Sequence, residues 1–316
     1  MLLIDLHRHL EGSARPSTVL ECARRDGHWL TEREHAAEQL TTNGRLSGLL
    51  PYLDRIDNAI SALPKESDWA RVGREAVADA AADGLDYVEL RFAPGLIART
   101  HGLSPEAVID AIADGAATAS AEHGPPIGLI GILVRTFGPE TAGNDLETIL
   151  RRQDRFVGVD LAGDEHGWPP ELFTRHFGRA RTAGLRTTAH AGEAAGPTSV
   201  IATVDHLAPE RIGHGTRSAE DPRLVERLAR EGIGLELALT SNVHTATAPS
   251  VETHPVASLI EAEVPVTLNT DNPTVSGTTL TAEHLAAGRA GLTDGDLRRA
   301  AENARHMAFR TIPQRS

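Results

Sequence analysis

The chain is 316 residues long, with 40% hydrophobic and 24% charged residues, a composition typical of a globular protein that forms one large domain. Its formal net charge is −13, and no cluster of basic residues is present, so neither a nucleic acid nor an anionic membrane is expected as a partner. Cys22 is the only cysteine, which excludes an intramolecular disulfide and favours a reducing compartment.

The N-terminal apolar run is short and is broken by Asp5 and His7. This pattern is typical of neither a signal peptide nor a membrane-spanning helix. We therefore expect a cytoplasmic location.

Eight β-rich runs alternate with longer alanine-rich stretches of helical character, several of which begin with Ser, Pro or Asp and end at Gly. The runs cover residues 2–9, 85–94, 127–137, 156–165, 186–193, 211–215, 232–242 and 265–272. Alternation of this kind predicts a parallel sheet, and eight repeats predict an α/β fold, a (β/α)8 TIM barrel, over residues 1–316 as a single domain. An open, doubly wound sheet is the alternative architecture.

The segment from about residue 14 to residue 80 is too long for one crossover helix. We expect it to form extra helices, inserted after the first strand and lying over the mouth of the barrel. Substrate specificity could be determined there.

Two histidines, His7 and His9, end the first predicted strand. Side chains at positions i and i+2 of a strand face the same way, so both imidazoles can reach one metal ion. An isolated H-x-H motif is weak evidence, because two ordinary surface or capping histidines give the same pattern.

Further polar residues end later strands: His190 the fifth, His214 the sixth and Asp271 the eighth. In this fold the carboxyl ends of the strands surround the active site. Taken singly, each residue is most simply interpreted as a hydrogen-bonded core or loop residue. Together, imidazoles and a carboxylate at one end of a barrel predict a site for zinc or a similar divalent ion, with room for a water molecule.

Glu193 follows His190 by three residues, close enough to share the surroundings of the metal. Hydrolysis by a metal-bound water needs a group that takes and returns a proton, and a carboxyl in a dry pocket suits that task. The alternative is a glutamate in the first turn of a helix, stabilised by the helix dipole.

The motifs HRHLEGS, DYVELRF, DLAGDE, HAGEAAGP, RIGHG, LTSN and NTDNP occur in this order between residue 7 and residue 273. This series resembles that of the adenosine deaminase family, over residues 2 to about 280. The resemblance implies zinc-dependent hydrolytic deamination of adenosine, or of a closely related adenine nucleoside, to the inosine-type product and ammonia.

The resemblance also implies roles for individual residues. By motif, one Zn²⁺ ion would be bound by His7, His9, His190 and Asp271. Glu193 would protonate N1 of the purine during attack at C6, and His214 would orient and support the attacking water. Gly163 would donate its backbone N–H to the purine N3, and Glu11 would contact the ribose.

The amino-acid content narrows the type of metal site. Related barrel amidohydrolases often bridge two metal ions with a carboxylated lysine on a central strand. Lys65 is the only lysine and lies in none of the predicted strands, so a mononuclear site is favoured. The deaminase architecture with an H-x-E and P-C-x-x-C zinc signature is excluded by the cysteine count.

Two positions depart from the family pattern. Glu11 stands where many members carry aspartate, a change that lengthens the reach to a sugar hydroxyl. Asn272 stands where the second of two consecutive aspartates binds the purine N7. An amide can donate to a neutral N7 without itself being protonated, so the substitution need not abolish purine binding, although it removes a charge beside the site. The alternatives are a neutral substitution, and a changed substrate or a weakened adenosine deaminase. If plain adenosine is the substrate, we expect Asn272→Asp to raise its turnover.

Three alternative functions remain open. Asn272 and the insertion at residues 14–80 are compatible with a deaminase of a modified adenine nucleoside, such as aminodeoxyfutalosine or a nucleoside of secondary metabolism. A catalytically silent barrel that binds a purine nucleoside is a second alternative, and an unrelated metallohydrolase is a third. His206, His244 and His254 are interpreted as ordinary loop or surface histidines.

Overall fold

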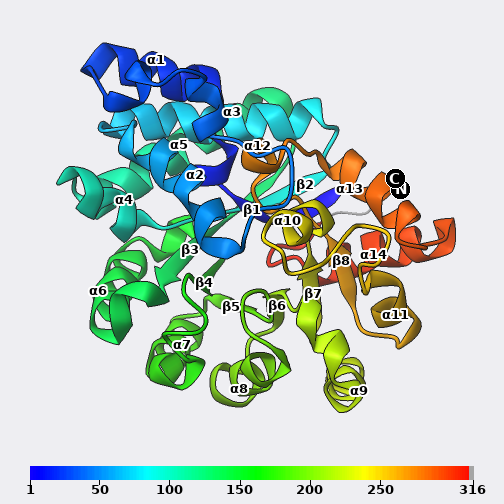
Figure 1. Ribbon diagram of the computed structural model, residues 1–316. Coiled ribbons are helices and arrows are strands. Elements are labelled where there is room, and N and C mark those ends of the chain that lie inside the picture. The colour runs from blue at the N-terminus through cyan, green and yellow to red at the C-terminus, as the bar shows by residue number, and fades with distance from the viewer. Residues whose placement is uncertain (313–316) are drawn as a thin grey trace.

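The computed structural model describes residues 1–312 and contains eight parallel strands that are hydrogen-bonded in sequence order. Helices surround them (Figure 1), which confirms the predicted (β/α)8 TIM barrel. The strands are β1 Ile4–His9, β2 Tyr87–Phe92, β3 Ile127–Val134, β4 Gly158–Ala162, β5 Arg186–Ala191, β6 Arg211–His214, β7 Gly234–Leu237 and β8 Val266–Leu268.

The α-helices of the described residues follow the strands in the expected alternation. They are α1 Pro16–Asp26, α2 Leu49–Ser61, α3 Glu66–Ala82, α4 Pro94–His101, α5 Pro105–His123, α6 Gly138–Arg151, α7 Thr174–Thr182, α8 Pro197–Leu207, α9 Pro222–Glu231, α10 Leu239–His244, α11 Val256–Glu261, α12 Pro273–Ser276, α13 Leu280–Arg289 and α14 Asp294–Met307. None of them is long and apolar enough to cross a membrane.

Backbone contacts beyond the end of β8 bring the last strand to the first. The backbone N–H of His9 donates to the carbonyl of Asp271 at 2.7 Å, and the N–H of Asp271 donates to the carbonyl of His7 at 2.8 Å. This bridge lies after the regular part of β8. Barrel closure therefore places Asp271 beside two histidines that are more than 260 positions away in the sequence.

Capping residues explain where several helices begin and end. Ser104 accepts the backbone N–H of Ala107 at the start of α5, and Asp221 accepts two N–H groups at the start of α9. Gly124 and Gly232 end these two helices in the left-handed conformation, where a side chain would be strained.

The insertion at residues 14–80 forms α1, α2 and α3 (Figure 1). Helix α2 lies over the mouth of the barrel, as predicted, and lines the cavity described below. Helix α3 instead packs against α5 in the outer layer. There a Cβ on Gly115 would lie 2.1 Å from the carbonyl oxygen of Ala70, so glycine permits the close approach of the two helices.

The predicted seventh run was too long. β7 ends at Leu237, and the LTSN motif lies on α10, where the N–H of Asn242 donates to the carbonyl of Ala238 at 2.9 Å. Residues 232–242 form a largely apolar run, and hydrophobicity alone does not separate a buried strand from a buried helix. The change matters because α10 carries Ser241 and Asn242 into the site.

Candidate active site

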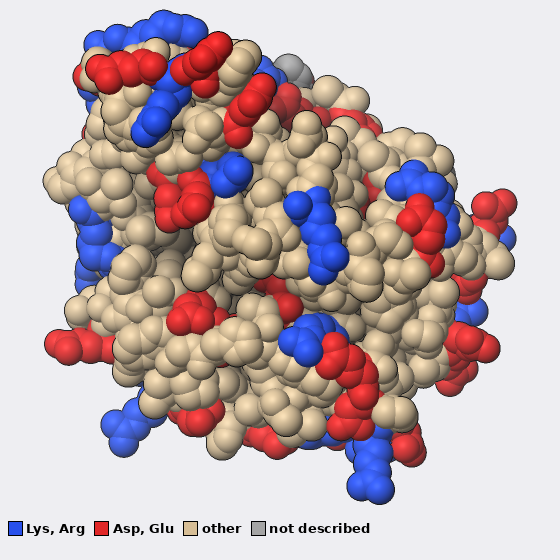
Figure 2. All heavy atoms as spheres, in the orientation of Figure 1, with Lys and Arg blue, Asp and Glu red and all other residues tan. Residues whose placement is uncertain are grey.

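A cavity of about 750 Å³ opens at the carboxyl ends of the strands. Figure 2 shows a hollow in this face of the molecule, with acidic side chains on its rim. Of the site residues predicted from the sequence, only His7 is absent from its walls, and that side chain is fully buried. The others line it: His9, Glu11, Gly163, His190, Glu193, His214, Asp271 and Asn272.

Four side chains converge at the inner end of the cavity. His7, His9, His190 and Asp271 each offer one ligand atom, and these atoms lie within 4.8 Å of one another. Nε2 of His9 is 3.2 Å from Nε2 of His190, and Oδ1 of Asp271 is 3.4 Å from Nε2 of His7 and 3.3 Å from Nε2 of His9.

The donor set fits a divalent cation. Nε2 of His7 is buried and has no hydrogen-bond partner within the described part of the chain, which is costly for a polar atom unless something else binds it. Burial lowers the pKa of His9 and of His190, so both rings are neutral and carry a lone pair. Three imidazole nitrogens and one carboxylate oxygen form a set that zinc accepts.

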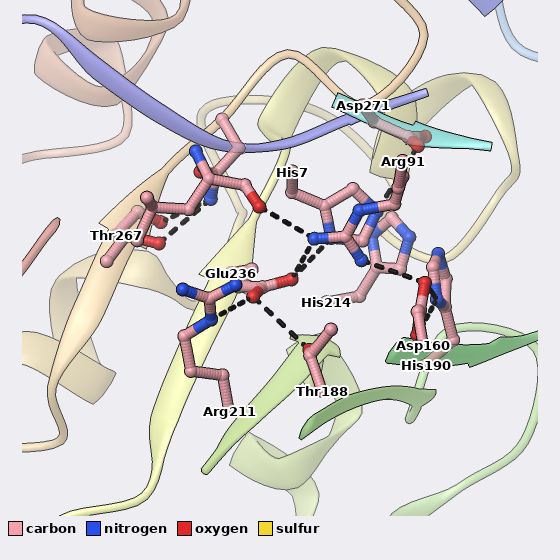
Figure 3. A network of polar contacts seen from close by, with 12 residues as sticks. His7, Arg91, Asp160, Thr188, His190, Arg211, His214, Glu236, Thr267 and Asp271 are labelled. Carbon is pink, nitrogen blue, oxygen red and sulfur yellow. Dashed lines mark hydrogen bonds and ion pairs between the residues drawn. The ribbon is translucent and has the colours of Figure 1, made fainter. Parts of the chain in front are cut away.

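Hydrogen bonds from the far side orient two of these rings (Figure 3). Nδ1 of His7 lies 2.7 Å from a carboxylate oxygen of Glu236, and Nδ1 of His190 lies 3.1 Å from Asp160. Each carboxylate holds the proton of its histidine on Nδ1, so that Nε2 is left free to bind the metal.

One guanidinium joins these two carboxylates. Arg91 is fully buried and donates to Asp160 at 2.9 Å and to Glu236 at 2.8 Å (Figure 3). Arg211 also pairs with Glu236. Burial alone would raise the pKa of Glu236, but the two guanidinium groups beside it outweigh this effect and hold that pKa well below its usual value. The carboxylate therefore stays charged inside the barrel.

Two site residues have a strained backbone. His214 has a φ of 60° and Asp271 a φ of 59°, a region that residues with a side chain rarely adopt. Such strain persists only where the surrounding structure enforces it, and it is concentrated at functional sites. The second oxygen of Asp271 accepts the hydroxyl of Ser241 at 2.5 Å, so the carboxylate is held at both ends.

Glu193 lies beside this cluster in the loop after β5 and is buried. Burial raises its pKa well above the usual value, and the negative charges of Asp271 and Glu165 raise it further. This shift favours the protonated form of the side chain, which can donate a proton. Nε2 of His214 lies 3.7 Å from one of its carboxyl oxygens.

Four further residues of the site were not identified from the sequence: Arg91, Asp160 and Glu236, which lie behind the walls of the cavity, and Glu165, which lines it. Three of them fall within the motifs DYVELRF and DLAGDE, but their long-range contacts are not visible in the sequence. His244 lies in helix α10 and is buried, so its interpretation as a loop or surface residue was wrong. His254 lies in a loop, as expected, but it is buried, and His206 is exposed as expected.

Comparison with known proteins identifies the family. The chain matches the model of the adenosine deaminase family over residues 3–316. It is 42% identical to an adenosine deaminase of Edwardsiella ictaluri, over 97% of this chain and 93% of that one. The chain belongs to the adenosine deaminase family.

Solved structures of several activities share this fold. Adenine deaminase of Arthrobacter aurescens has a TM-score of 0.89 and 27% identity, covering 98% of this chain and 94% of that one. A zinc-bound amidohydrolase of Burkholderia ambifaria has a TM-score of 0.89 and 26% identity, covering 98% and 86%. The N6-methyl-AMP deaminase of Arabidopsis thaliana has a TM-score of 0.83 and 27% identity, covering 98% and 92%.

Three further residues of the family motifs surround the space where a substrate would lie. Glu11 accepts the backbone N–H of Ala93 at 2.7 Å with one oxygen, while its other oxygen is buried without a partner in the described structure. Burial raises the pKa of Glu11 to about 7. Gly163 has a φ of 109°, and a Cβ there would lie 2.5 Å from the hydroxyl of Thr136.

Asn272 is buried next to the first turn after β1. Its Oδ1 has no partner within residues 1–312, and a Cβ on Gly12 would lie 1.9 Å from that atom. Glycine at position 12 therefore makes the space into which the Asn272 amide fits.

Helix α2 supplies the outer wall of the cavity. It contributes apolar side chains and two exposed carboxylates, Asp54 and Asp57. Within residues 1–312, no lysine or arginine lines the cavity. The end of a ligand that is remote from the histidine cluster therefore meets apolar and acidic groups. The apolar residues are Leu49, Leu50, Leu53, Ile56 and Ile60.

Proposed function

We propose that this protein hydrolyses the amino group from C6 of adenosine, or of a closely related adenine nucleoside, giving the inosine-type product and ammonia. One observation carries the proposal: Glu193, a buried carboxyl whose pKa is raised, lines the cavity at whose inner end three histidines and an aspartate converge. The relatives at about 42% identity that are named adenosine deaminases support the same reaction.

A single zinc ion is the proposed cofactor, bound by His7, His9, His190 and Asp271. When bound, such an ion lowers the pKa of a water molecule towards about 7 and so supplies a nucleophile at neutral pH. Within the described residues the only lysine is Lys65, just before α3. Its ammonium group pairs with Asp26 at the end of α1 and does not line the cavity, which favours one metal ion over a lysine-bridged pair.

The protein side chains perform the remaining steps. Glu193 donates its proton to N1 of the purine, which makes C6 electrophilic. As the oxygen of water adds to C6, His214 supports the charge on that oxygen. One proton of the water reaches the departing amino group through Glu193, and the C6–N6 bond breaks to release ammonia. The second proton of the water, lost as the C6 carbonyl forms, returns to Glu193 and restores its acid form. General acid–base catalysis by one positioned group typically contributes 10²- to 10⁴-fold.

We propose further that the substrate is a nucleoside and not a nucleoside 5′-phosphate. The reacting C6 must lie at the histidine cluster, so the rest of the substrate extends towards α2. A phosphate there would meet Asp54 and Asp57 with no basic side chain to compensate its charge, and like charges placed together are unfavourable. The cavity therefore suits a substrate without a 5′-phosphate, whereas the substrate in the name of the N6-methyl-AMP deaminase carries one.

A modified adenine nucleoside is the second candidate. The apolar side chains of α2, among them the exposed Leu50, provide a surface for an apolar substituent at the far end of the substrate. Asn272, in place of a charged group, also supports this candidate.

A panel of substrates tests the proposal. Zinc-loaded protein is incubated with adenosine, 2′-deoxyadenosine, 5′-substituted adenosines, adenine and AMP, and ammonia release is measured. We expect turnover of at least one nucleoside and little of AMP. Tight nucleoside binding without ammonia release would instead indicate a silent binding barrel. Absence of metal together with absence of activity after zinc addition would contradict the proposal.

Two broader statements belong to the same proposal. Residues 1–316 act as one domain, because the first and last strands complete a single barrel around one site. The location is cytoplasmic, which is supported by the lone cysteine, Cys22; its thiol is buried 3.5 Å from Asp68.

A further inference from the structure

We infer that a chain of hydrogen bonds from the backbone of Val256 through His254 and Asn242 fixes the proton of His214 on Nε2. In this arrangement His214 meets the reacting oxygen as a hydrogen-bond donor and cannot act as the base that deprotonates it. His254 and Asn242 are then positioning residues. The chemical consequence rests on the proposed function, whereas the proton position is a property of the protein alone.

The backbone N–H of Val256 determines which groups donate and which accept along this series of hydrogen bonds. The N–H of Val256 lies 3.2 Å from Nδ1 of His254, and a backbone N–H can only donate. Nδ1 of His254 must therefore carry a lone pair. His254 is 4% exposed, and burial lowers its pKa to about 3, so the ring is neutral and its one proton lies on Nε2.

The second link orients an amide. Nε2 of His254 lies 3.1 Å from Oδ1 of Asn242, and because this nitrogen carries the proton, the oxygen of Asn242 must face it. Thr216 also approaches this oxygen, at 2.7 Å. A hydroxyl can rotate to donate or to accept, so Thr216 is compatible with either orientation of the amide and only His254 selects one.

The third link reaches the catalytic site. With Oδ1 of Asn242 turned towards His254, its Nδ2 donates to Nδ1 of His214 at 3.1 Å. Because an amide N–H can only donate, Nδ1 of His214 is the acceptor and must carry a lone pair. The one proton of the ring therefore lies on Nε2.

The position of Nε2 makes this proton useful. It lies 3.7 Å from the Glu193 carboxyl, and the ring centroid of His214 is 4.8 Å from that of His7 and 5.2 Å from that of His190. A donor already oriented towards the place where negative charge develops needs no rearrangement during the reaction, which is how such groups stabilise a transition state.

The first experiment reverses the direction of the hydrogen bond between Asn242 and His214. In zinc-loaded protein labelled with ¹⁵N-histidine, the ring nitrogens of His214 are assigned by comparison with His214→Gln. We expect a proton on Nε2 and a lone pair on Nδ1. In Asn242→Asp both side-chain oxygens accept, so Nδ1 of His214 acquires a proton, and kcat falls roughly 10²- to 10³-fold, as for loss of one preorganised donor, with a much smaller change in KM.

Two variants of His254, at the start of this series of hydrogen bonds, give an independent test. His254→Leu removes the selecting donor, so His214 should show a mixture of its two tautomers. His254→Gln retains an N–H that can face Asn242 and should restore the Nε2–H form. Thr216→Val removes the unselective hydroxyl, and the tautomer of His214 should stay unchanged.

Two outcomes would overturn the inference. One is a proton on Nδ1 of His214 in the unaltered protein. The other is the Nε2–H form persisting in both Asn242→Asp and His254→Leu. Since the tautomer is read by NMR, failure of the substrate panel would contradict the proposed function without changing this result.

Discussion

The carboxylate of Glu165 holds the backbone of Glu193. It accepts the N–H of Glu193 at 3.2 Å, and those of Gly192, Ala194 and Ala195 at 2.5, 2.9 and 2.9 Å. These four successive amides form the loop that carries the proposed proton donor. These hydrogen bonds therefore position Glu193, and the negative charge of Glu165 helps to raise the pKa of the Glu193 side chain.

Replacing Glu165 should lower the rate of catalysis more than it weakens the binding of substrate. In Glu165→Gln an amide NH₂ takes the place of one oxygen and faces N–H groups that need an acceptor. We expect kcat to fall about 10- to 100-fold, since small misplacements of a catalytic group have effects of this size, with metal content unchanged. Steady-state kinetics and metal analysis check this. Glu171→Gln, at an exposed position of the same loop region, is the control and should behave like the unaltered protein.

The carboxylate behind His190 should control metal affinity. Asp160→Asn keeps an acceptor for Nδ1 of His190 but removes the charge that makes the ring a stronger ligand. Loss of such a partner typically weakens metal binding 10- to 100-fold, measured as the zinc Kd by competition with a chelator. Asp145, a buried carboxylate paired with Arg99 on the outer helices, provides the matched control Asp145→Asn. Equal zinc affinity of the two variants would contradict the assigned role.

Burial of His254 makes folding sensitive to acid. Its pKa is about 3 in the folded protein, against about 6.5 in the unfolded chain. Between these values the unfolded state binds the extra proton, so the stability contributed above pH 6.5 is lost as the pH falls towards 3. At pH 5 the loss is about 2 kcal/mol.

The variant His254→Gln isolates this effect. The free energy of unfolding is measured by denaturant titration at pH 7 and at pH 5 for both proteins. Between these two pH values it should fall by about 2 kcal/mol less in His254→Gln than in the unaltered protein. Other histidines titrate in both proteins and cancel in the comparison. Parallel losses in the two proteins would show that His254 can be protonated without cost in the fold.

Asn272 offers a test of the natural substrate. Asn272→Asp restores the second acidic group of the family motif beside Asp271, and Gly12 leaves space for a side chain of equal size. If plain adenosine is the substrate, kcat/KM for adenosine should rise several-fold. If kcat/KM for adenosine is the same in Asn272→Asp and in the unaltered protein, a different substrate is favoured, one that the Asn272 amide binds as well as an aspartate would.

The strand-end residues were predictable because of a rule that needs no long-range information. Side chains alternate along β1, so His7 and His9 face the same way, and the carboxyl ends of parallel strands meet at one edge. The structure brings His7, His9, His190 and Asp271 together, and their binding of a metal ion stays a prediction. The boundary of β7 was not predictable, because an apolar run can continue as a helix when the packing favours it.

Glu165, Arg91 and His254 illustrate what the sequence alone did not reveal. In the sequence, Glu165 is an acidic residue after a strand, Arg91 a charged residue within one and His254 a loop histidine. Their roles depend on partners 28, 145 and 12 positions away, respectively. Such pairings arise only when the barrel closes and excludes water.

The sequence by itself determined the alternation of strands and helices, the family, and the set of residues proposed to bind a metal ion and transfer a proton. These depend on local periodicity and on residue chemistry, which are properties of short segments. The tertiary structure alone decided the raised pKa of Glu193, the charge balance around Arg91 and the hydrogen-bond partners of His214. Each of these depends on burial and on which atoms face one another, and so on the packing of the whole barrel.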